Sequence, residues 1–140
     1  MKRWFALLTT LLLGLAALPA EAEEPAMQMS INGTPVTVAW EDNDAVRALR
    51  ELAADGLTIR MSMYGGFEQV GPIGRRLPSQ DEQTATVSGD IVLYAGDQLV
   101  VFYGSNAWAY TRLGRITDKT PDEMTALLSH GDVTVTLTLD

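Results

Sequence analysis

The centre of the chain reads Ile91-Val92-Leu93-Tyr94-Ala95-Gly96-Asp97-Gln98-Leu99-Val100-Val101-Phe102-Tyr103, two apolar runs on either side of a four-residue turn. An apolar run of four or five residues bounded by turn residues is typical of a strand that is covered on both faces, or that lines an apolar groove with one of them. We therefore predict a hairpin at residues 91–103 within a closed barrel. We expect residues 65–82 and the region around Trp108 to fold over it and leave a cleft.

On both sides of this hairpin the chain alternates apolar and polar residues. The alternation occurs in residues 27–31, 57–63 and 133–139, and it predicts strands with one buried and one solvated face. Asn32-Gly33 follows the first of these runs, and Asn-Gly is the strongest short signal for a hairpin because both residues tolerate positive φ. The return strand is expected at residues 36–40.

Two helices are predicted between the strands. Residues 44–54 place apolar side chains on one face, with Asp42 or Asn43 as the N-cap. The second helix begins at Thr120-Pro121 and has Glu123 three residues after its N-cap, the spacing of a capping box. Seven or eight short strands with two short helices predict a mainly β fold, a small closed or nearly closed barrel whose open ends are covered by the helices.

Residues 65–82 do not fit this pattern. The segment holds four glycines, two prolines and two arginines, with few apolar residues at regular spacing. A connection of this length in a small domain is typically functional or disordered. We expect a long loop here.

The N-terminus is typical of an export signal. Lys2 and Arg3 precede the uncharged, leucine-rich residues 4–18, and Ala20-Glu21-Ala22 supplies the small-x-small pattern of a signal peptidase site. The apolar run is shorter than the roughly 20 residues that span a bilayer, so an uncleaved anchor is the weaker alternative. We predict a signal peptide at residues 1–22 and one domain at residues 23–140, periplasmic or extracellular after cleavage.

The composition of the predicted mature chain argues against several functions. It has 8 basic and 17 acidic residues, a net charge of −9, which argues against nucleic acid and anionic membrane surfaces as partners. There is no cysteine, and His130 is the only histidine, so thiol chemistry is absent and a zinc or copper site is not expected. Motifs for a phosphate-binding loop, a calcium loop and a serine nucleophile are incomplete. We expect no metal and no cofactor.

Four stretches carry a family likeness. They are Met63-Tyr64-Gly65-Gly66-Phe67-Glu68-Gln69-Val70-Gly71-Pro72-Ile73-Gly74-Arg75-Arg76-Leu77-Pro78, Gly89-Asp90-Ile91-Val92-Leu93-Tyr94, Val100-Val101-Phe102-Tyr103-Gly104-Ser105-Asn106-Ala107-Trp108 and Tyr110-Thr111-Arg112-Leu113-Gly114-Arg115-Ile116. In these stretches the chain resembles the bacterial cyclophilin-like domain proteins, a family of cyclophilin-like fold and unknown function. The resemblance covers most of residues 30–140 and implies a closed barrel of eight strands with two helices.

True cyclophilins have this barrel and isomerise peptidyl-proline bonds. Their motifs include a Phe-Met-x-Gln segment and a Trp-Leu-Asp-Gly type of loop, and neither occurs in this sequence. The resemblance therefore implies the fold, and it transfers no catalytic residue to a position of this chain.

The candidate groove combines aromatic side chains with a few polar ones. Phe102, Trp108 and Tyr110 fall within nine residues, and an apolar floor with polar groups at its edge is what a small ligand or an extended peptide requires. The alternative for these aromatic residues is ordinary core packing beside a turn. The predicted ligand-binding residues are Tyr64, Glu68, Arg75, Phe102, Asn106, Trp108, Tyr110 and Arg112, with Arg76 also at the rim.

Three functions are open on the sequence alone. The first is a binding module for a small molecule or an extended peptide. The second is a divergent peptidyl-prolyl cis-trans isomerase, in which Arg112, Arg75 or Arg76 favours a lone pair on the prolyl nitrogen and so lowers the barrier of about 20 kcal/mol to rotation. The third is a module that docks a partner protein through its surface.

Overall fold

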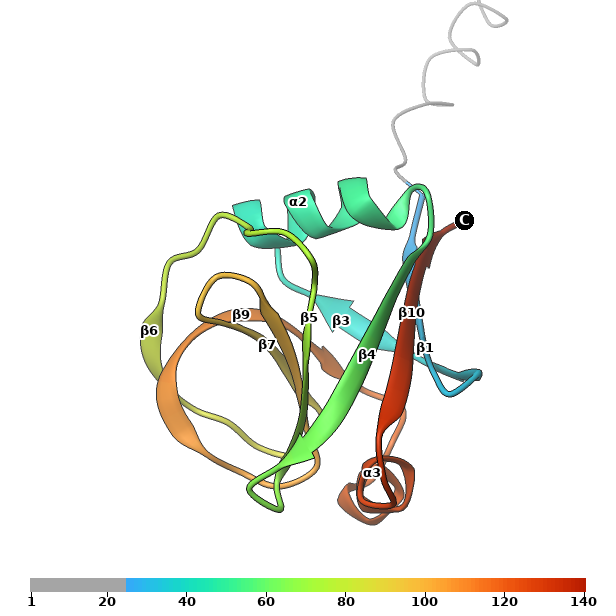
Figure 1. Cartoon of the computed structure of the whole chain (residues 1–140), viewed down its shortest axis with the longest axis vertical. Coiled ribbons are helices and arrows are strands. Elements are labelled where there is room, and N and C mark those ends of the chain that lie inside the picture. The colour runs from blue at the N-terminus through green and yellow to red at the C-terminus, as the bar shows by residue number, and fades with distance from the viewer. Residues whose placement is uncertain (1–24) are drawn as a thin grey trace, which may run out of the picture.

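A computed structural model describes residues 25–140 of the chain (Figure 1). The predicted signal peptide, residues 1–22, lies outside the described residues and stays a prediction. Within the described part of the chain, no helix has the length and apolarity needed to cross a membrane. The elements are β1 (Met27–Ile31), β2 (Thr34–Val36), β3 (Val38–Trp40), α2 (Asp44–Ala53), β4 (Leu57–Tyr64), β5 (Glu68–Pro72), β6 (Glu82–Ala85), β7 (Asp90–Tyr94), β8 (Gln98–Phe102), β9 (Ala107–Ile116), α3 (Pro121–Leu128) and β10 (Val133–Leu139).

The strands form one antiparallel sheet that curls into a nearly closed barrel. In sheet order they are β2, β1, β10, β4, β5, β8, β7, β9 and β3, and β6 pairs with β9 beside this path. The outermost strands, β2 and β3, are separated in the chain only by Thr37. This continuous segment pairs with β1 through β2 and with β9 through β3, and so connects the two edges of the sheet. The predicted mainly β barrel with two helices is confirmed. The structure has ten strands where the resemblance implies eight, because the return strand divides at Thr37 and the short β6 is added.

The central hairpin, β7 with β8, is apolar on both faces as the sequence predicts. Residues of one face belong to the main core of the barrel, and residues of the other face form a smaller cluster with Tyr110. The core face carries Ile91, Leu93, Leu99 and Val101, and the outer face carries Val92, Val100 and Phe102. β8 lies between β5 and β7, so the hairpin is an interior part of the sheet. A tight turn joins its strands, with Ala95 at φ 54° and Gly96 at φ 80°.

Both predicted helices are present and are capped as expected. α2 lies across one end of the barrel, and α3 lies at the opposite end beside β10 (Figure 1). Asn43 is the N-cap of α2 and accepts a hydrogen bond of 2.9 Å from the amide of Val46. Thr120 and Glu123 form the capping box of α3. The residues that the two helices bury are Ala45, Val46, Leu49 and Ala53 from α2 and Met124 and Leu128 from α3.

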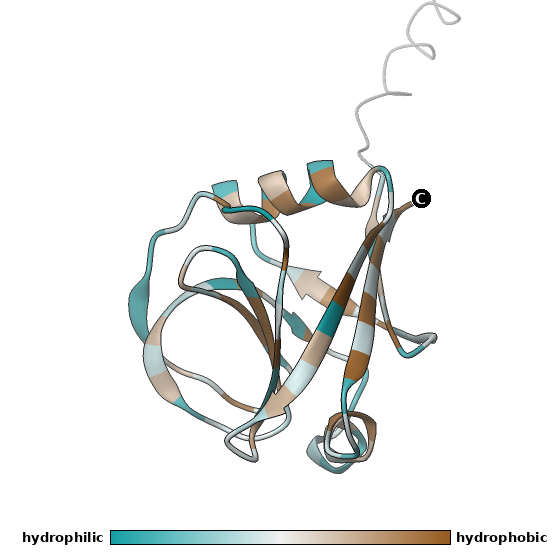
Figure 2. Cartoon of the chain, viewed as in Figure 1, coloured by the Kyte–Doolittle hydropathy of each residue, from teal (hydrophilic) through white to brown (hydrophobic). Residues whose placement is uncertain are grey.

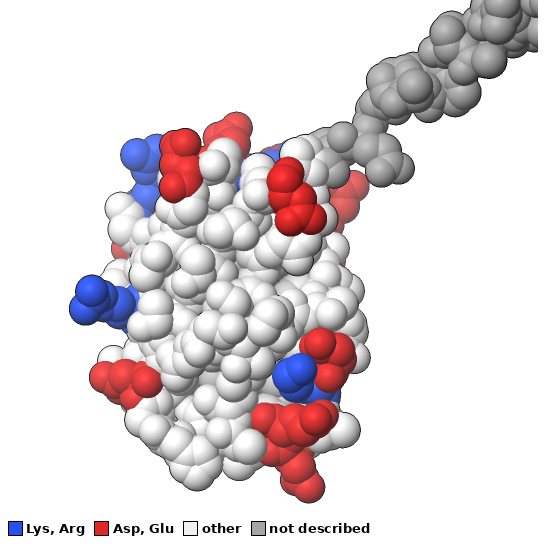
Figure 3. Space-filling view, turned by 90° about the vertical axis from the view of Figure 1, so that its right-hand side faces the viewer, with Lys and Arg blue, Asp and Glu red and all other residues white. Residues whose placement is uncertain are grey.

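Strands β4 and β10 alternate between the core and solvent. The alternation appears as changes of colour along both strands in Figure 2, and the half-buried or exposed positions of β10 include Thr134, Thr136 and Thr138. Figure 3 shows the face of the molecule on this side, where charged side chains lie around the edges and the centre carries none. This face has no basic patch of the kind that binds phosphates.

The segment at residues 65–82, predicted as a loop, contains the interior strand β5, which pairs with β4 and β8. The residue types of β5 are determined by contacts with distant segments, and they do not alternate between apolar and polar. A Cβ at Gly71 would lie 2.3 Å from the carbonyl oxygen of Arg60, so the close approach of β4 requires glycine. The buried side-chain amide of Gln69 donates to two carbonyl oxygens at the end of α3, both at 2.8 Å. The loop prediction is therefore wrong for this strand.

Strand β9 bends halfway along its length. Its first half, residues 107–110, pairs with β6, whereas its second half pairs with β7 and β3. The register against β7 shifts between Ile91 and Val92, a β-bulge, and bulges bend the strand that contains the extra residue. The first half of β9 and β6 therefore curve away from the barrel strands (Figure 1), which leaves room over the outer face of the central hairpin.

Candidate functional site

A cleft of about 710 Å³ opens between the β4–β5 turn and the first half of β9. We call it the aromatic cleft. Its lining residues come from β4, β5, β7 and β9 and the connections beside them: Tyr64, Gly65, Phe67, Glu68, Val70, Tyr94, Asn106, Trp108 and Tyr110. Five of the ten aromatic residues of the chain line this one cleft. Its volume lies in the usual range for sites that enclose small organic ligands.

The floor of the aromatic cleft is a stack of rings on the outer face of the hairpin. Phe102 is fully buried and lies parallel to Phe67, with 6.4 Å between the ring centroids. Tyr110 forms edge-type contacts with Phe102 and Tyr94, with 5.7 Å and 6.2 Å between the ring centroids. Phe102, which the sequence predicts as a lining residue, therefore supports the floor from beneath.

Glu68 is the one carboxyl group of the cleft. It begins β5, where it pairs with Tyr64 of β4 and Phe102 of β8, and only 6% of its surface is exposed. Its carboxyl group has no hydrogen bond or ion pair with any of residues 25–140, and burial raises its pKa to about 7. A buried carboxyl group without a partner is costly when ionised, and such groups gather at functional sites.

Tyr110 and Asn106 form the polar edge of the cleft. The side-chain amide of Asn106 donates to the Tyr110 hydroxyl at 2.8 Å. Burial raises the pKa of Tyr110, an effect that this hydrogen bond partly offsets and that the nearby charge of Glu68 reinforces. The backbone of Asn106 is fixed in turn by the hydroxyl and amide of Thr86. The Tyr110 phenol is therefore neutral near pH 7 and keeps its own proton to donate.

The rim of the cleft is unusually exposed for aromatic residues. Tyr64 is 64% exposed and Trp108 is 56% exposed, and Tyr94 is also classed with the exposed large apolar side chains. Together with Met63 and Val87 they make up that whole class among residues 25–140. Three of its five members border one cleft, which is the distribution expected of a binding surface.

The structure does not bring all the predicted site residues together. Tyr64, Glu68, Asn106, Trp108 and Tyr110 line the cleft, whereas Arg75, Arg76 and Arg112 do not. The bend in β9 places Arg112 beside the buried carboxylate of Asp90, at 3.4 Å. Arg75 is exposed on the connection between β5 and β6, and Arg76 approaches Asp97 at 3.9 Å.

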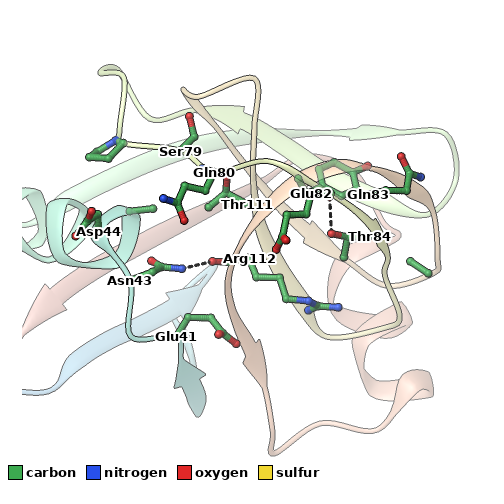
Figure 4. A pocket seen from close by; sticks show the side chains of 14 residues that line it. Glu41, Asn43, Asp44, Ser79, Gln80, Glu82, Gln83, Thr84, Thr111 and Arg112 are labelled. Carbon is green, nitrogen blue, oxygen red and sulfur yellow. Dashed lines mark hydrogen bonds between the residues drawn. The ribbon is translucent and has the colours of Figure 1, made fainter.

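A second hollow, of about 700 Å³, lies where β9 passes from β6 to β3 (Figure 4). We call it the polar hollow. Arg112 lies in it, with Glu41 and Glu82 among the charged neighbours that Figure 4 labels. The side-chain amide of Asn43 donates a hydrogen bond of 2.9 Å to the backbone carbonyl of Arg112. The carboxylates here are exposed, and no group of three or more possible metal ligands occurs among residues 25–140.

Sequence reasoning missed Phe67, Val70 and Tyr94 as lining residues. Tyr94 follows Val92 by two positions on β7, so the two-residue period of a strand already placed it on the outer face of the hairpin. Phe67 and Val70 gave no such signal, because they fall in the segment predicted as a loop.

Comparisons with known proteins agree with this architecture. A family model described as the Cyclophilin-like family matches residues 29–138. The solution structure of the hypothetical protein AF2241 from Archaeoglobus fulgidus is similar, with a TM-score of 0.61, 15% sequence identity, and coverage of 88% of this chain and 100% of that one. At this identity the likeness concerns the fold alone. No curated protein matches the sequence.

Proposed function

This chain belongs to the cyclophilin-like family, and we propose that, once exported, it binds a small organic molecule in the aromatic cleft. Export is supported by the basic residues, the uncharged apolar run and the small-x-small site at residues 1–22. Binding is supported by the shape and the lining of the cleft. The single observation that carries the proposal is the convergence of five aromatic side chains around one buried carboxyl group that has no partner.

The ring faces supply the affinity in this proposal. Aromatic side chains bury large areas at little conformational cost, and apolar surface removed from water contributes about 25 cal/mol per Å². Because Phe67, Phe102 and Tyr110 already pack against one another, a ligand does not have to order the floor. Asn106, Tyr110 and Glu68 are the groups available to orient it through hydrogen bonds.

The cleft favours binding over prolyl isomerisation. The isomerase hypothesis requires an arginine over the bound proline, and none of the arginines of residues 25–140 lines the aromatic cleft. Arg112, the predicted candidate, is directed to Asp90 instead. The interaction-module hypothesis needs a contact of about 800 Å² on each partner, and the concave form of the cleft suits a small molecule better.

A thermal-shift screen with a tryptophan readout tests the proposal. A ligand that binds only the folded state raises the melting temperature, and in the aromatic cleft it also changes the fluorescence of Trp108. We expect at least one compound of a panel of small aromatic, aliphatic and amine molecules to raise the melting temperature by several degrees. The fluorescence change should persist in Trp40→Phe, which removes the other tryptophan of residues 25–140, and disappear in Trp108→Phe.

Two results would contradict the proposal. One is a panel in which no compound stabilises the protein. The other is a stabilising compound that binds Trp108→Ala as tightly as the unaltered chain, because its site would then lie elsewhere. If only extended peptides bind, the small-molecule proposal is wrong and the cleft is a peptide site.

A further inference from the structure

The lining of the aromatic cleft contains a group that becomes negatively charged but no group that is positively charged among residues 25–140. Within this described part of the chain, Glu68 is the only carboxyl group that lines the cleft, and no lysine, arginine or histidine does. The other titratable groups of the lining are the phenols of Tyr64 on β4, Tyr94 on β7 and Tyr110 on β9. Only 6% of the surface of Glu68 is exposed, and none of residues 25–140 places a cation beside its carboxyl group, so its negative charge is unmatched when it ionises.

We propose that the ligand of the aromatic cleft is an organic cation, an alkylammonium or quaternary ammonium group held between the aromatic rings and the carboxylate of Glu68. The inference rests on the proposed function of the cleft and names the chemical class that it takes. A ligand cation would form the ion pair with Glu68 that no side chain of residues 25–140 forms.

Ring faces and a carboxylate recognise such a group together. The face of an aromatic ring carries negative charge and attracts a cation placed over Tyr or Trp, more strongly when water is excluded. Quaternary ammonium groups cannot donate N–H hydrogen bonds and depend on this attraction. The same site is poor for an anion, which would meet Glu68 and the ring faces without any compensating cation.

The overall charge of the protein acts in the same direction. The predicted mature chain has a net charge of −9, so its long-range field attracts cations and repels anions. This contribution is weakened by salt, with a screening length of about 10 Å at 0.1 M. Binding to the buried carboxylate of Glu68 should survive at salt concentrations that remove the long-range attraction.

A matched pair of probes separates charge from shape. Choline carries a permanent positive charge, and 3,3-dimethylbutan-1-ol has nearly the same shape without one. We expect choline to bind at least tenfold more tightly at pH 8, measured by titration of Trp108 fluorescence in 0.15 M salt. Glu68→Gln should reduce this preference to about twofold. The control Glu82→Gln, which removes an exposed carboxylate outside the cleft, should retain it.

The pH dependence identifies the responsible group. Choline does not titrate, so its affinity follows the ionisation of Glu68, whose pKa lies at about 7 because of burial. Affinity should be constant well above pH 7, fall as the pH drops through about 7, and level off about fivefold lower, where only the attraction of the rings remains. The dependence should be absent in Glu68→Gln.

Failure of this inference differs from failure of the proposed function. If the neutral alcohol binds as tightly as choline, and neither raises the melting temperature of Trp108→Ala, the cleft is a ligand site and the cation inference is wrong. If choline shows no binding up to 50 mM, or binds Glu68→Gln unchanged, the inference is also overturned. The compound panel decides separately whether the cleft binds anything.

Discussion

Glu68 on β5 and Asp90 on β7 are both buried carboxyl groups of one sheet, yet their surroundings differ completely. Asp90 is 0% exposed and receives hydrogen bonds from Arg115 at 2.7 Å, from the Val87 amide at 2.9 Å and from Arg112 at 3.4 Å. Burial alone would raise the pKa of Asp90, but these donors together lower it below its usual value. At Glu68 burial acts without opposition, and its pKa rises.

The contrast separates Asp90, whose charge is paired within the fold, from Glu68, whose charge is not. The charge of Asp90 is matched by protein groups that hold β7 against β9, so the fold itself accounts for that residue. The charge of Glu68 is matched by nothing among residues 25–140, and its neighbours are aromatic rings that open to solvent. Among residues 25–140, two guanidinium groups lie beside Asp90 and none lies beside Glu68. This difference supports our proposal that Glu68 meets a ligand.

The largest expected effect is the loss of the Asp90 charge. Asp90→Asn should lower the free energy of unfolding by about 3 kcal/mol at pH 7, because a neutral amide loses the charge-assisted hydrogen bonds that the buried carboxylate accepts from Arg115 and the Val87 amide. Urea unfolding of both proteins measures the difference. Choline affinity should change less than twofold, since Asp90 does not line the aromatic cleft. A change below 0.5 kcal/mol would show that Asp90 contributes little to the fold.

Removal of the Glu68 charge should have the opposite sign. The pKa of Glu68 rises from 4.5 to about 7 on folding, so the folded state binds this proton more tightly than the unfolded state does. Stability from this group is fully present below pH 4.5 and is lost as the pH rises through about 7. Glu68→Gln should therefore be more stable than the unaltered chain by up to about 3 kcal/mol at pH 8, and about equally stable at pH 4.

The difference between the two proteins isolates this group, because all other titratable groups are common to both. Urea unfolding at pH 4, 6 and 8 measures it. A Glu68→Gln protein that is less stable than the unaltered chain at pH 8 would mean that the carboxylate has a favourable partner in the folded state. The comparison with Asp90 would then fail.

Local patterns were enough to predict most of the fold. The two-faced apolar character of residues 91–103 follows from the sequence because a two-residue period divides Ile91 and Leu93 from Val92, and the structure places these side chains in two separate clusters. Both helices were predictable from capping chemistry, which depends on residues only three positions apart. The Asn32-Gly33 turn was predictable for the same reason, with φ values of 49° and 81°.

The features that escaped prediction depend on contacts between distant segments. β5 carries Glu68, Gln69 and Gly71 in succession, and each is determined by a different part of the fold: the aromatic cleft, the end of α3 and the backbone of Arg60. No local periodicity encodes such contacts, so the strand resembled a loop. Tyr64, Trp108 and Tyr110 were predictable from the sequence, whereas Phe67 lay in the segment predicted as a loop. The direction of Arg112 depended on a bulge in β9 that no residue type announces.

The smallest expected effect concerns Arg112, which sequence reasoning assigned to the ligand groove. Arg112→Gln should lower the free energy of unfolding by about 1 kcal/mol or less, because Arg115 still holds Asp90 at 2.7 Å and the Arg112 side chain is itself partly solvated. Urea unfolding measures this change, and titration of Trp108 fluorescence with choline should give an affinity within twofold of the unaltered chain. Arg115→Gln is the matched control in stability, with a larger loss expected from the shorter contact.

The measurements on Arg112→Gln decide whether Arg112 contributes to ligand binding or to the ion pair with Asp90. If Arg112→Gln abolishes choline binding and leaves stability unchanged, the arginine belongs to the cleft in solution, and the division between a paired and an unpaired carboxyl group collapses. If the loss of stability in Asp90→Asn is smaller when Arg112→Gln is already present, the two residues are coupled. Arg112 is then part of the structural pair, and Glu68 remains the only charged side chain that the aromatic cleft offers to a ligand.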